Sequence, residues 1–304
     1  MNESKSDNAG RRLPAWLKRP AGCGRTYQQV RDVLADLELA TVCGSAGCPN
    51  QGECFSQGTA TFMILGEVCT RDCQFCRVAH GAVAPVSSDE PSRVAEASAR
   101  LQLRHVVVTS VTRDDLADGG AEHFAETIRA IRRRLENATI EVLTPDFTGD
   151  TDCLDTVCEA RPDVFNHNLE TTRRLTPEIR SAADYERSLS VLGYVAGKED
   201  GPIVKSGFMI GLGETEDEIN ELLRDLREAG VRMVTIGQYL RPSKRNREVH
   251  KFYRPEEFET IKDKADAMGF EHVAAGPFVR SSYHAGLSKQ EIDKTTKDTK
   301  KERI

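Results

Sequence analysis

The sequence predicts an α/β fold built as a full or partial barrel of βα units. From about residue 60, short runs rich in β-branched and aromatic residues alternate with longer segments whose apolar residues recur every three or four positions. This alternation is typical of repeated βα units around a parallel sheet. The chain has 304 residues, of which 38% are hydrophobic, and this is enough for one such barrel. A doubly wound open sheet is the alternative architecture.

The predicted strands are short, apolar and rich in β-branched residues, and turn or helix signals bound them. Six or seven βα units match a (βα)6-type barrel, whose active site lies at the carboxyl ends of the strands. The strand segments lie at residues 61–65, 105–110, 139–143, 163–167, 203–210, 232–236 and 271–275.

Capping signals and apolar stripes predict helices between these strands. Thr215 and Glu218 have the spacing of a capping box, and Gly230 can end the helix that they begin. Pro255 stands at the first turn of a later helix. The apolar stripes, which predict packing against a sheet, are Ile219, Leu222, Leu223 and Leu226; Phe124, Ile128, Ile131 and Leu135; and Phe258, Ile261, Ala265 and Met268.

Both ends of the chain differ from this alternating middle. Residues 1–60 hold one amphipathic segment, at 27–39, and three clustered cysteines, so we expect an N-terminal extension that caps the barrel. Residues 61–275 form the predicted barrel, and 276–304 form a short C-terminal segment. The tail after Leu287 is highly charged and nearly free of large apolar residues, which predicts disorder.

Composition excludes several classes of protein. No apolar run approaches the roughly 18 residues that span a bilayer, and the first residues lack the apolar region of a signal peptide. We therefore expect a cytoplasmic protein without a membrane segment. A net charge of −6 argues against nucleic-acid binding. In a reducing compartment, nine unevenly clustered cysteines indicate metal chemistry rather than disulfides.

Six of the nine cysteines form two groups of three. The first group has the spacing CxxxxCxxxxxC, and the second has the spacing CxxxCxxC directly after the first predicted strand. A structural zinc site takes four protein ligands and a disulfide two, so three thiolates predict a metal centre with one free position. Soft thiolates select iron–sulfur clusters, zinc or copper; a zinc or purely structural site is the alternative. The groups are Cys43, Cys48 and Cys54, and Cys69, Cys73 and Cys76.

The second group, in EVCTRDCQFCRVAHG, resembles the signature of the radical S-adenosylmethionine (SAM) superfamily. GFMIGLGE, at residues 207–214, is similar to the superfamily motif GxIxGxxE, with Met209 in place of the usual isoleucine. The resemblance implies a radical SAM barrel and a 4Fe–4S cluster on Cys69, Cys73 and Cys76. Its open iron would bind SAM, whose cleavage yields a carbon radical that abstracts hydrogen from an unactivated carbon.

Residues that follow the predicted strands are expected to contact SAM, because barrel enzymes bind ligands there. Phe75 has an alternative role, which is to cover the cluster from solvent. Asp114, Asp115 and Asp118 are expected to cap the next helix or to contact solvent. His167 is expected to be structural, since hydrogen-atom abstraction needs no protein base. The expected SAM contacts are Phe75, Ser110, Asn168, Glu170, Gly207 and Met209.

The first group resembles the auxiliary-cluster motif of the lipoyl synthase family, and so do TATFMILG, VTSVTRDDLADGGAEHF, DVFNHNLET, GQYLRPS and GPFVRSSYHA. Together with further similar stretches, these cover most of residues 42–285. The resemblance implies a second 4Fe–4S cluster on Cys43, Cys48 and Cys54, with a serine oxygen on the fourth iron. Ser282 is the expected ligand and Ser281 the alternative. Arg280 and Tyr283 are expected to position substrate.

The same resemblance implies a sulfurtransferase of lipoate biosynthesis. Such enzymes insert two sulfur atoms at carbons six and eight of an octanoyl chain on a carrier-protein lysine, using SAM and the auxiliary cluster as sulfur donor. The implied partners are octanoylated lipoyl-carrier domains (2-oxoacid dehydrogenase E2 or glycine cleavage H protein), a low-potential electron donor such as ferredoxin or flavodoxin, and an iron–sulfur carrier. Another two-cluster radical SAM enzyme and an iron–sulfur carrier or redox sensor are the rival hypotheses.

Three cysteines lie outside both groups. Cys153 and Cys158 fall in a predicted helix beside Leu154 and Val157, and Cys23 stands alone near the N-terminus. Since free cysteines commonly behave as small buried hydrophobes, we expect no metal centre from these three.

Overall fold

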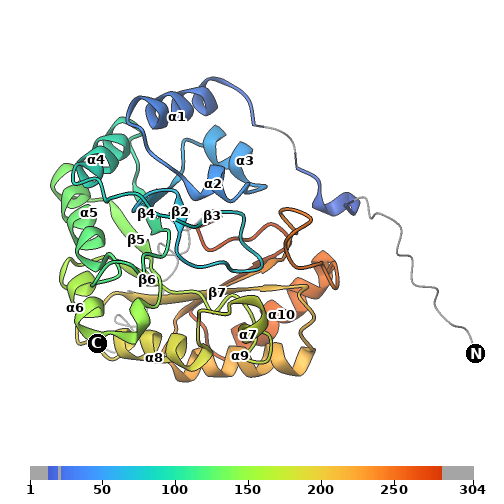
Figure 1. The fold of residues 1–304 in the computed structure, drawn as a ribbon. Helices are drawn as coiled ribbons and strands as arrows, with labels where there is room; N and C mark the ends of the chain where they lie inside the picture. The colour runs from blue at the N-terminus through green and yellow to red at the C-terminus, as the bar shows by residue number, and fades with distance from the viewer. Residues whose placement is uncertain (1–12, 20–21, 283–304) are drawn as a thin grey trace, which may run out of the picture.

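Seven parallel strands form one sheet that follows the chain order β1-β4-β5-β6-β7-β8-β9 (Figure 1). The computed structural model describes residues 13–19 and 22–282. All seven predicted strands are present, so the prediction of a parallel α/β fold is confirmed. They are β1 Thr61–Ile64, β4 His105–Ser110, β5 Thr139–Leu143, β6 Val164–Asn166, β7 Ile203–Ile210, β8 Met233–Gln238 and β9 His272–Gly276.

The sheet is an open barrel. Each strand pairs in parallel with the next, as in the register Thr61↔Val107 and His105↔Thr139. Among the strands that the structure describes, β1 and β9 are the two edges and do not pair with each other. The partial form of the predicted barrel is therefore the one that the chain adopts.

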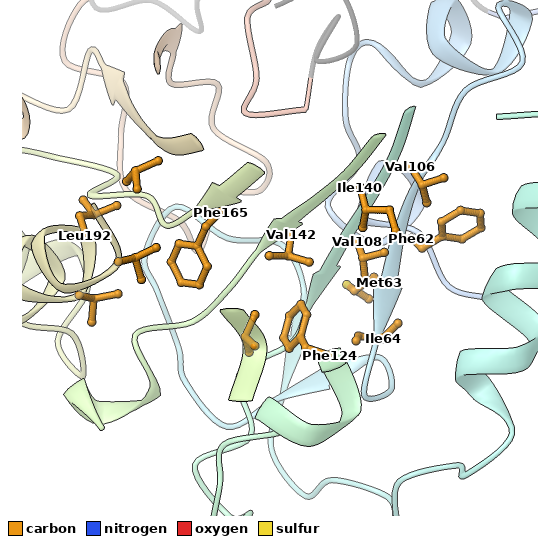
Figure 2. Packing of buried hydrophobic residues seen from close by; sticks show 14 of the residues in the cluster. Phe62, Met63, Ile64, Val106, Val108, Phe124, Ile140, Val142, Phe165 and Leu192 are labelled. Atoms are coloured by element: carbon orange, nitrogen blue, oxygen red, sulfur yellow. The ribbon is translucent and has the colours of Figure 1, made fainter. Parts of the chain in front are cut away.

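Alternation along the strands separates a helix-covered face from an inner face. Side chains from β1, β4, β5 and β6 pack together with Phe124 and Leu192 of the covering helices (Figure 2). Burying one large apolar side chain stabilises the fold by about 1.5–3 kcal/mol, so this layer holds the helices in place. Glu141 lies between Ile140 and Val142 in β5 and points to the opposite face, because successive side chains of a strand alternate.

The helices between the strands begin and end as the local chemistry predicts. The capping box of α9 is present: the amide of Glu218 donates to Thr215 Oγ1 at 3.3 Å, and the amide of Thr215 donates to Glu218 Oε2 at 2.8 Å. The larger helices, arranged in an arc around the sheet (Figure 1), are α4 Glu90–Arg100, α5 Ala121–Arg134, α6 Thr151–Glu159, α8 Tyr185–Ala196, α9 Glu216–Glu228 and α10 Pro255–Ala267. Two short helices, η2 Phe147–Gly149 and α7 Thr176–Ile179, follow β5 and β6.

The N-terminal part lies against the β1 edge. The amphipathic segment forms α1 Arg25–Asp36, and it packs on α3 Gln51–Ser56 through a ring contact between Tyr27 and Phe55. An antiparallel bridge between Thr41 and Phe62 joins this part to β1. Thr41 then caps α2 Val42–Ser45, so the helix that carries Cys43 starts at the edge of the barrel. The short η1 Ala15–Leu17 precedes these helices.

The segment after β9 runs back across the barrel to β1. It passes β8 at Gly237, where a Cβ atom would lie 2.3 Å from the carbonyl oxygen of Val279. Asn50 Nδ2 then donates to the carbonyl of Phe278 at 2.6 Å, and the guanidinium of Arg19 stacks 4.3 Å from the Phe278 ring centroid. The N-terminal and C-terminal parts therefore meet beside the open side of the sheet.

Two features complete the fold. A parallel pair of two-residue strands, β2 Val68–Cys69 and β3 Ala79–His80, brackets the CxxxCxxC loop. Within the described ranges, the structure contains no helix with the length and apolar character to cross a membrane. The charged tail and Tyr283 lie outside the described residues.

Candidate active site

A cavity of about 1140 Å³ lies on the inner side of the barrel, and residues of both cysteine groups line it. Its wall includes all three cysteines of the first group and Cys76 of the second. Strands β7 and β8 add Phe208, Met209 and Gly237, and the C-terminal segment adds residues 279–282. The cavity thus joins the two groups that the sequence keeps apart.

In the second group, Cys69 ends β2, and Cys73 and Cys76 lie on the loop between β2 and β3. Backbone amides point at its sulfur atoms: Cys69 Sγ accepts from Thr112 at 3.3 Å, and Cys76 Sγ accepts from Val78 at 3.4 Å. Burial, together with the charges of Cys73 and Cys69, raises the pKa of Cys76 to about 12. Amide hydrogen bonds to sulfur stabilise thiolates and tune the potential of a cluster.

An arginine clamp holds this loop. Arg71 Nη2 donates to Asp114 Oδ1 at 2.7 Å and to Asp146 Oδ1 at 2.8 Å, while Arg187 Nε donates to Asp146 Oδ2 at 2.9 Å. Burial alone would raise the pKa of Asp146, but the hydrogen bond and charge of Arg71 lower it well below its usual range. Asp146 therefore stays ionised between two arginines and fixes the loop.

The aspartates after β4 have different roles. Asp118 caps α5, because its carboxylate accepts the amides of Gly120 and Glu122 at 2.9 Å each; the capping prediction is confirmed there. Asp114 contacts solvent, as expected, and its carboxylate also pairs with Arg71 of the cysteine loop, which the sequence did not predict. Asp115 pairs with Arg113.

The first group is carried by α2, α3 and the turn between them. Burial raises the pKa of Cys43 to about 11 and that of Cys54 to about 12. The charges of Cys43 and Cys48 both contribute to the shift at Cys54, so the three thiols are close neighbours. Both groups are therefore half-buried or buried sets of thiols whose proton a metal must displace.

Ser281 and Ser282 have different hydrogen-bond partners. Thr61 Oγ1 donates to Ser282 Oγ at 2.9 Å, and Thr61 also lies beside Cys43, where its backbone and side chain act to lower the pKa of that thiol. Ser281 Oγ instead accepts from Asn168 Nδ2 at 2.6 Å. Ser282 thus lies beside the first cysteine group, whereas Ser281 is held by a residue at the end of β6.

The expected SAM contacts form two sets. Asn168 Nδ2 donates to Glu170 Oε1 at 3.0 Å, and burial raises the pKa of Glu170. Phe75 and Met209 line the cavity with these two residues and pack against the small core around Tyr239. All four therefore line the same cavity.

Gly207 and Ser110 lie farther into the sheet. A Cβ on Gly207 would approach Thr235 Oγ1 to 2.4 Å and Asn168 Oδ1 to 3.0 Å, so only glycine allows this close packing of β7, β8 and Asn168. Ser110 ends β4, and its buried Oγ has no hydrogen-bond partner among the described residues. Neither residue is among those that line the described part of the cavity.

Other sequence predictions have clear outcomes. His167 is structural, as expected: Thr144 O lies 3.0 Å from Nδ1 and Ser188 Oγ 3.1 Å from Nε2, and burial lowers its pKa to about 4. Cys153 is buried and Cys158 is half-buried, both in α6, while Cys23 is exposed.

Arginine side chains form a part of the site that sequence patterns only partly reveal. Arg280 is half-buried near Cys48 and Glu170; loss of solvent lowers its pKa, and those two groups oppose the shift. Arg180 was not predicted: its Nη1 donates to the carbonyls of Asn168 and Leu169 at 3.1 and 2.9 Å, and its charge acts on Cys73. It follows α7 rather than a strand end, so no motif indicated it.

The donor sets fit iron–sulfur clusters better than a single ion. Among the described residues, no three His, Cys, Asp or Glu side chains converge closely enough to hold one metal ion. In a four-iron cluster each thiolate binds its own iron, so the thiols are spread around a larger object. Two all-cysteine groups at one cavity are the donor chemistry that such clusters require.

Comparisons with known proteins agree with this chemistry. A family model for the radical SAM superfamily matches residues 63–226, and a model for the N-terminal domain of lipoyl synthase of the radical SAM family matches residues 1–48. Together they span the first cysteine group in part and the second in full.

Curated relatives match over nearly the whole chain. A lipoyl synthase from Rubrobacter xylanophilus is 53% identical over 272 residues, which is 90% of this chain and 85% of that protein. A lipoyl synthase from Caldanaerobacter subterraneus is 53% identical over 281 residues, 91% of this chain and 98% of that protein.

Solved structures support the fold alone. Methylornithine synthase has a TM-score of 0.52 at 13% identity, covering 82% of this chain and 85% of its own. Streptococcus suis SuiB bound to S-adenosylmethionine has a TM-score of 0.53 at 11% identity, covering 74% of this chain; the chain spans about half of that protein, 54%.

The fold, the CxxxCxxC loop at the cavity and the superfamily match define a radical SAM enzyme, and a 4Fe–4S cluster and SAM are its cofactors. The two lipoyl synthases that are each 53% identical to this chain narrow the assignment to one family within the radical SAM superfamily. The chain belongs to the lipoyl synthase family, a family of radical SAM sulfurtransferases.

Proposed function

We propose that the protein inserts two sulfur atoms at carbons six and eight of an octanoyl group on a carrier-protein lysine, to give the lipoyl cofactor. The proposal includes a second, sacrificial 4Fe–4S cluster as the sulfur source. One observation carries it: all three cysteines of the first group, Cys76 of the second group and Ser282 line a single cavity. Two centres at one cavity suit a reaction in which a radical is made and sulfur is delivered at the same carbon.

Cys69, Cys73 and Cys76 hold the SAM-binding cluster in this proposal. The support is the loop itself, clamped by Arg71 and capped by amide hydrogen bonds. When bound, the reduced cluster and SAM supply the carbon radical that side chains cannot provide. Asn168 and Glu170 offer polar groups to SAM. Phe75 and Met209 line the cavity beside them. Ser110 and Gly207 complete the SAM site from farther into the sheet.

Cys43, Cys48 and Cys54 hold the second cluster, with Ser282 on the fourth iron. The hydrogen bond from Thr61 supports Ser282 over Ser281, because Thr61 also contacts Cys43, while Ser281 is engaged by Asn168. A hydroxyl oxygen is a poorer partner than thiolate for a soft iron–sulfur centre. Ser282 is therefore the ligand most easily released when the cluster is consumed.

The rest of the cavity suits an acyl chain. Apolar side chains such as Val107, Leu143 and Phe208 line it, and they exclude water from a carbon radical. Arg280, near Cys48 and Glu170, and Tyr283 position the substrate. The macromolecular partners are octanoylated lipoyl-carrier domains, a low-potential electron donor and an iron–sulfur carrier. The chain then has three parts. An extension that bears the auxiliary cluster spans residues 1–60, the barrel spans 61–275, and the segment that bears Ser282 spans 276–304.

Incubation of the anaerobically reconstituted protein with reductant, SAM and an octanoylated carrier domain tests the proposal. We expect the carrier to gain the mass of two sulfur atoms while 5′-deoxyadenosine accumulates. A carrier domain without the octanoyl group is the matched control. Release of 5′-deoxyadenosine without sulfur gain would overturn the sulfur-insertion assignment and leave the radical SAM class intact.

A further inference from the structure

Lys205 is a lysine buried inside a strand. It lies in β7 with only 1% of its side chain exposed, and its Nζ donates to Glu141 Oε1 of β5 at 2.8 Å. The carboxylate of Glu141 also accepts from Asn166 Nδ2 at 3.3 Å and lies 3.2 Å from His105 Nε2. Burial would raise the pKa of Glu141, but the charge of Lys205 lowers it to about 2. Fully buried lysines are rare unless they are paired.

Lys205 has a third contact, and it leaves the sheet. Its Nζ donates to the carbonyl oxygen of Ser281 at 2.6 Å. The hydroxyl of the same serine accepts from Asn168 at 2.6 Å. Ser281, which precedes Ser282, is thus held through both its carbonyl oxygen and its side-chain hydroxyl.

Stability alone does not explain a buried ion pair in this place. Replacing such a pair by apolar residues of similar volume is often neutral or stabilising, because desolvation offsets the attraction. The neighbouring strand positions that face the helices are apolar, as Ile140 and Val142 show. What the pair adds is a charged donor that reaches the segment carrying Ser282.

We propose that the Lys205–Glu141 pair is a positioning device for Ser282. By holding the Ser281 carbonyl, it keeps the Ser282 hydroxyl beside the first cysteine group and sets how readily this oxygen leaves the auxiliary cluster. Glu141 orients the ammonium group, and Lys205 acts on iron only through the serine peptide. The inference rests on the proposed function, since it takes Ser282 as a cluster ligand.

The test is the rate at which a ferrous chelator removes iron from the reconstituted full-length protein with both clusters. The phase that belongs to the first group is assigned from the variant in which Cys69, Cys73 and Cys76 are replaced by alanine. Lys205→Met with Glu141→Gln removes both charges and leaves no buried ion unpaired. We expect this phase to accelerate about tenfold, the loss expected from one charged hydrogen bond.

A double-mutant cycle separates positioning from general weakening of the barrel. Ser282→Ala should also accelerate the phase, and adding it to the Lys205–Glu141 double variant should change nothing further, because both act through one contact. The Mössbauer signal of the serine-ligated iron should be lost in each. Lys262→Met with Asp266→Asn, an exposed ion pair at 2.6 Å, is the control and should release iron at the wild-type rate.

The outcomes are distinguishable. If Ser282→Ala accelerates release but the Lys205–Glu141 double variant does not, the positioning inference is wrong and the proposed function stands. If Ser282→Ala itself has no effect, the ligand assignment in the proposed function fails. If the two effects multiply, the pair acts on the barrel rather than on Ser282, which also overturns the inference. Should the double variant not fold, Lys205→Gln, which is too short to reach Ser281, gives the same readout.

Discussion

Thr61, the first residue of β1, donates a hydrogen bond of 2.9 Å to the hydroxyl of Ser282, the last described residue of the chain. Through the contact between Thr61 and Cys43, the end of the chain reaches a cysteine group near its start. This connection distinguishes Ser282 from Ser281, whose hydroxyl accepts from Asn168 instead.

Replacing Cys43, Cys48 and Cys54 together by alanine should halve the iron content. We expect about eight irons per reconstituted wild-type chain and about four in the variant, because each four-iron cluster depends on its own thiolates. Iron analysis after anaerobic reconstitution measures this. Cys153→Ala with Cys158→Ala is the control and should keep all the iron. Full iron in the triple variant would contradict a cluster at the first group.

Ser282→Cys should slow sulfur transfer while 5′-deoxyadenosine release persists. A thiolate binds iron more firmly than a hydroxyl oxygen does, so the fourth position would no longer open readily. Single-turnover assays that follow sulfur on the carrier and 5′-deoxyadenosine together make the comparison. Ser281→Cys should have the smaller effect on sulfur transfer, and the reverse order would favour Ser281 as the ligand.

Gly237→Ala should displace the serine-bearing segment. A Cβ at this position would lie 2.3 Å from the carbonyl oxygen of Val279, which is backbone and cannot move without its segment. We expect faster iron loss from the first group and at least a tenfold loss of sulfur insertion, of the size that a small misplacement of reacting groups causes. Gly276→Ala, whose added Cβ would be 3.4 Å from Val279 Cγ2, is the matched control and should behave as wild type.

Asp146→Asn should weaken the loop of the second cysteine group. The carboxylate is fully buried between Arg71 and Arg187, and breaking a buried pair costs about 3–5 kcal/mol when the partner charge remains. Chemical denaturation of the reconstituted protein and the rate of SAM cleavage should both report the loss. Asp114→Asn, at a carboxylate with 36% of its side chain exposed, should cost much less, and equal effects would argue against the clamp.

The metal-free protein should lose stability as the pH falls from about 6.5 to 4. His167 is buried, and its pKa is lowered from 6.5 to about 4. In this range the unfolded chain binds a proton that the folded chain does not, so the free energy of unfolding decreases with falling pH, by about 3 kcal/mol for this group. Urea unfolding at several pH values in reductant measures it. His167→Gln should remove most of that slope, whereas His250→Gln, at an exposed residue, should not.

Local patterns in the sequence were sufficient for the elements of the fold. The capping box at Thr215 and the β-branched runs act over a few residues, and these signals predicted all seven strands of the barrel and its largest helices. The two-residue strands β2 and β3 were missed, because a segment of that length has no periodicity to read.

Long-range contacts of the site were harder to foresee. The cysteine spacing and the family resemblance predicted which residues to examine, and the structure brings Asn168, Glu170, Met209 and Arg280 to one cavity. Nothing in the spacing indicates that Asp146 meets Arg71, or that Arg180 reaches the end of β6. These contacts depend on how distant strands are ordered. Lys205 had one usable signal, a charged residue within an apolar strand.

The open side of the barrel gives the protein an order of assembly. Thr61 and the cysteines around it leave the ribosome well before Ser282, which follows 221 residues later and hydrogen bonds to Thr61 beside the first group. The loop of Cys69, Cys73 and Cys76 also depends on later segments, because Arg187 donates to Asp146 and Asn246 Nδ2 donates to the carbonyl of Cys76 at 2.8 Å. Both cysteine groups therefore reach their final surroundings only after most of the barrel has been translated. Under the proposed function, the centre that is to be spent is finished last, when Ser282 emerges.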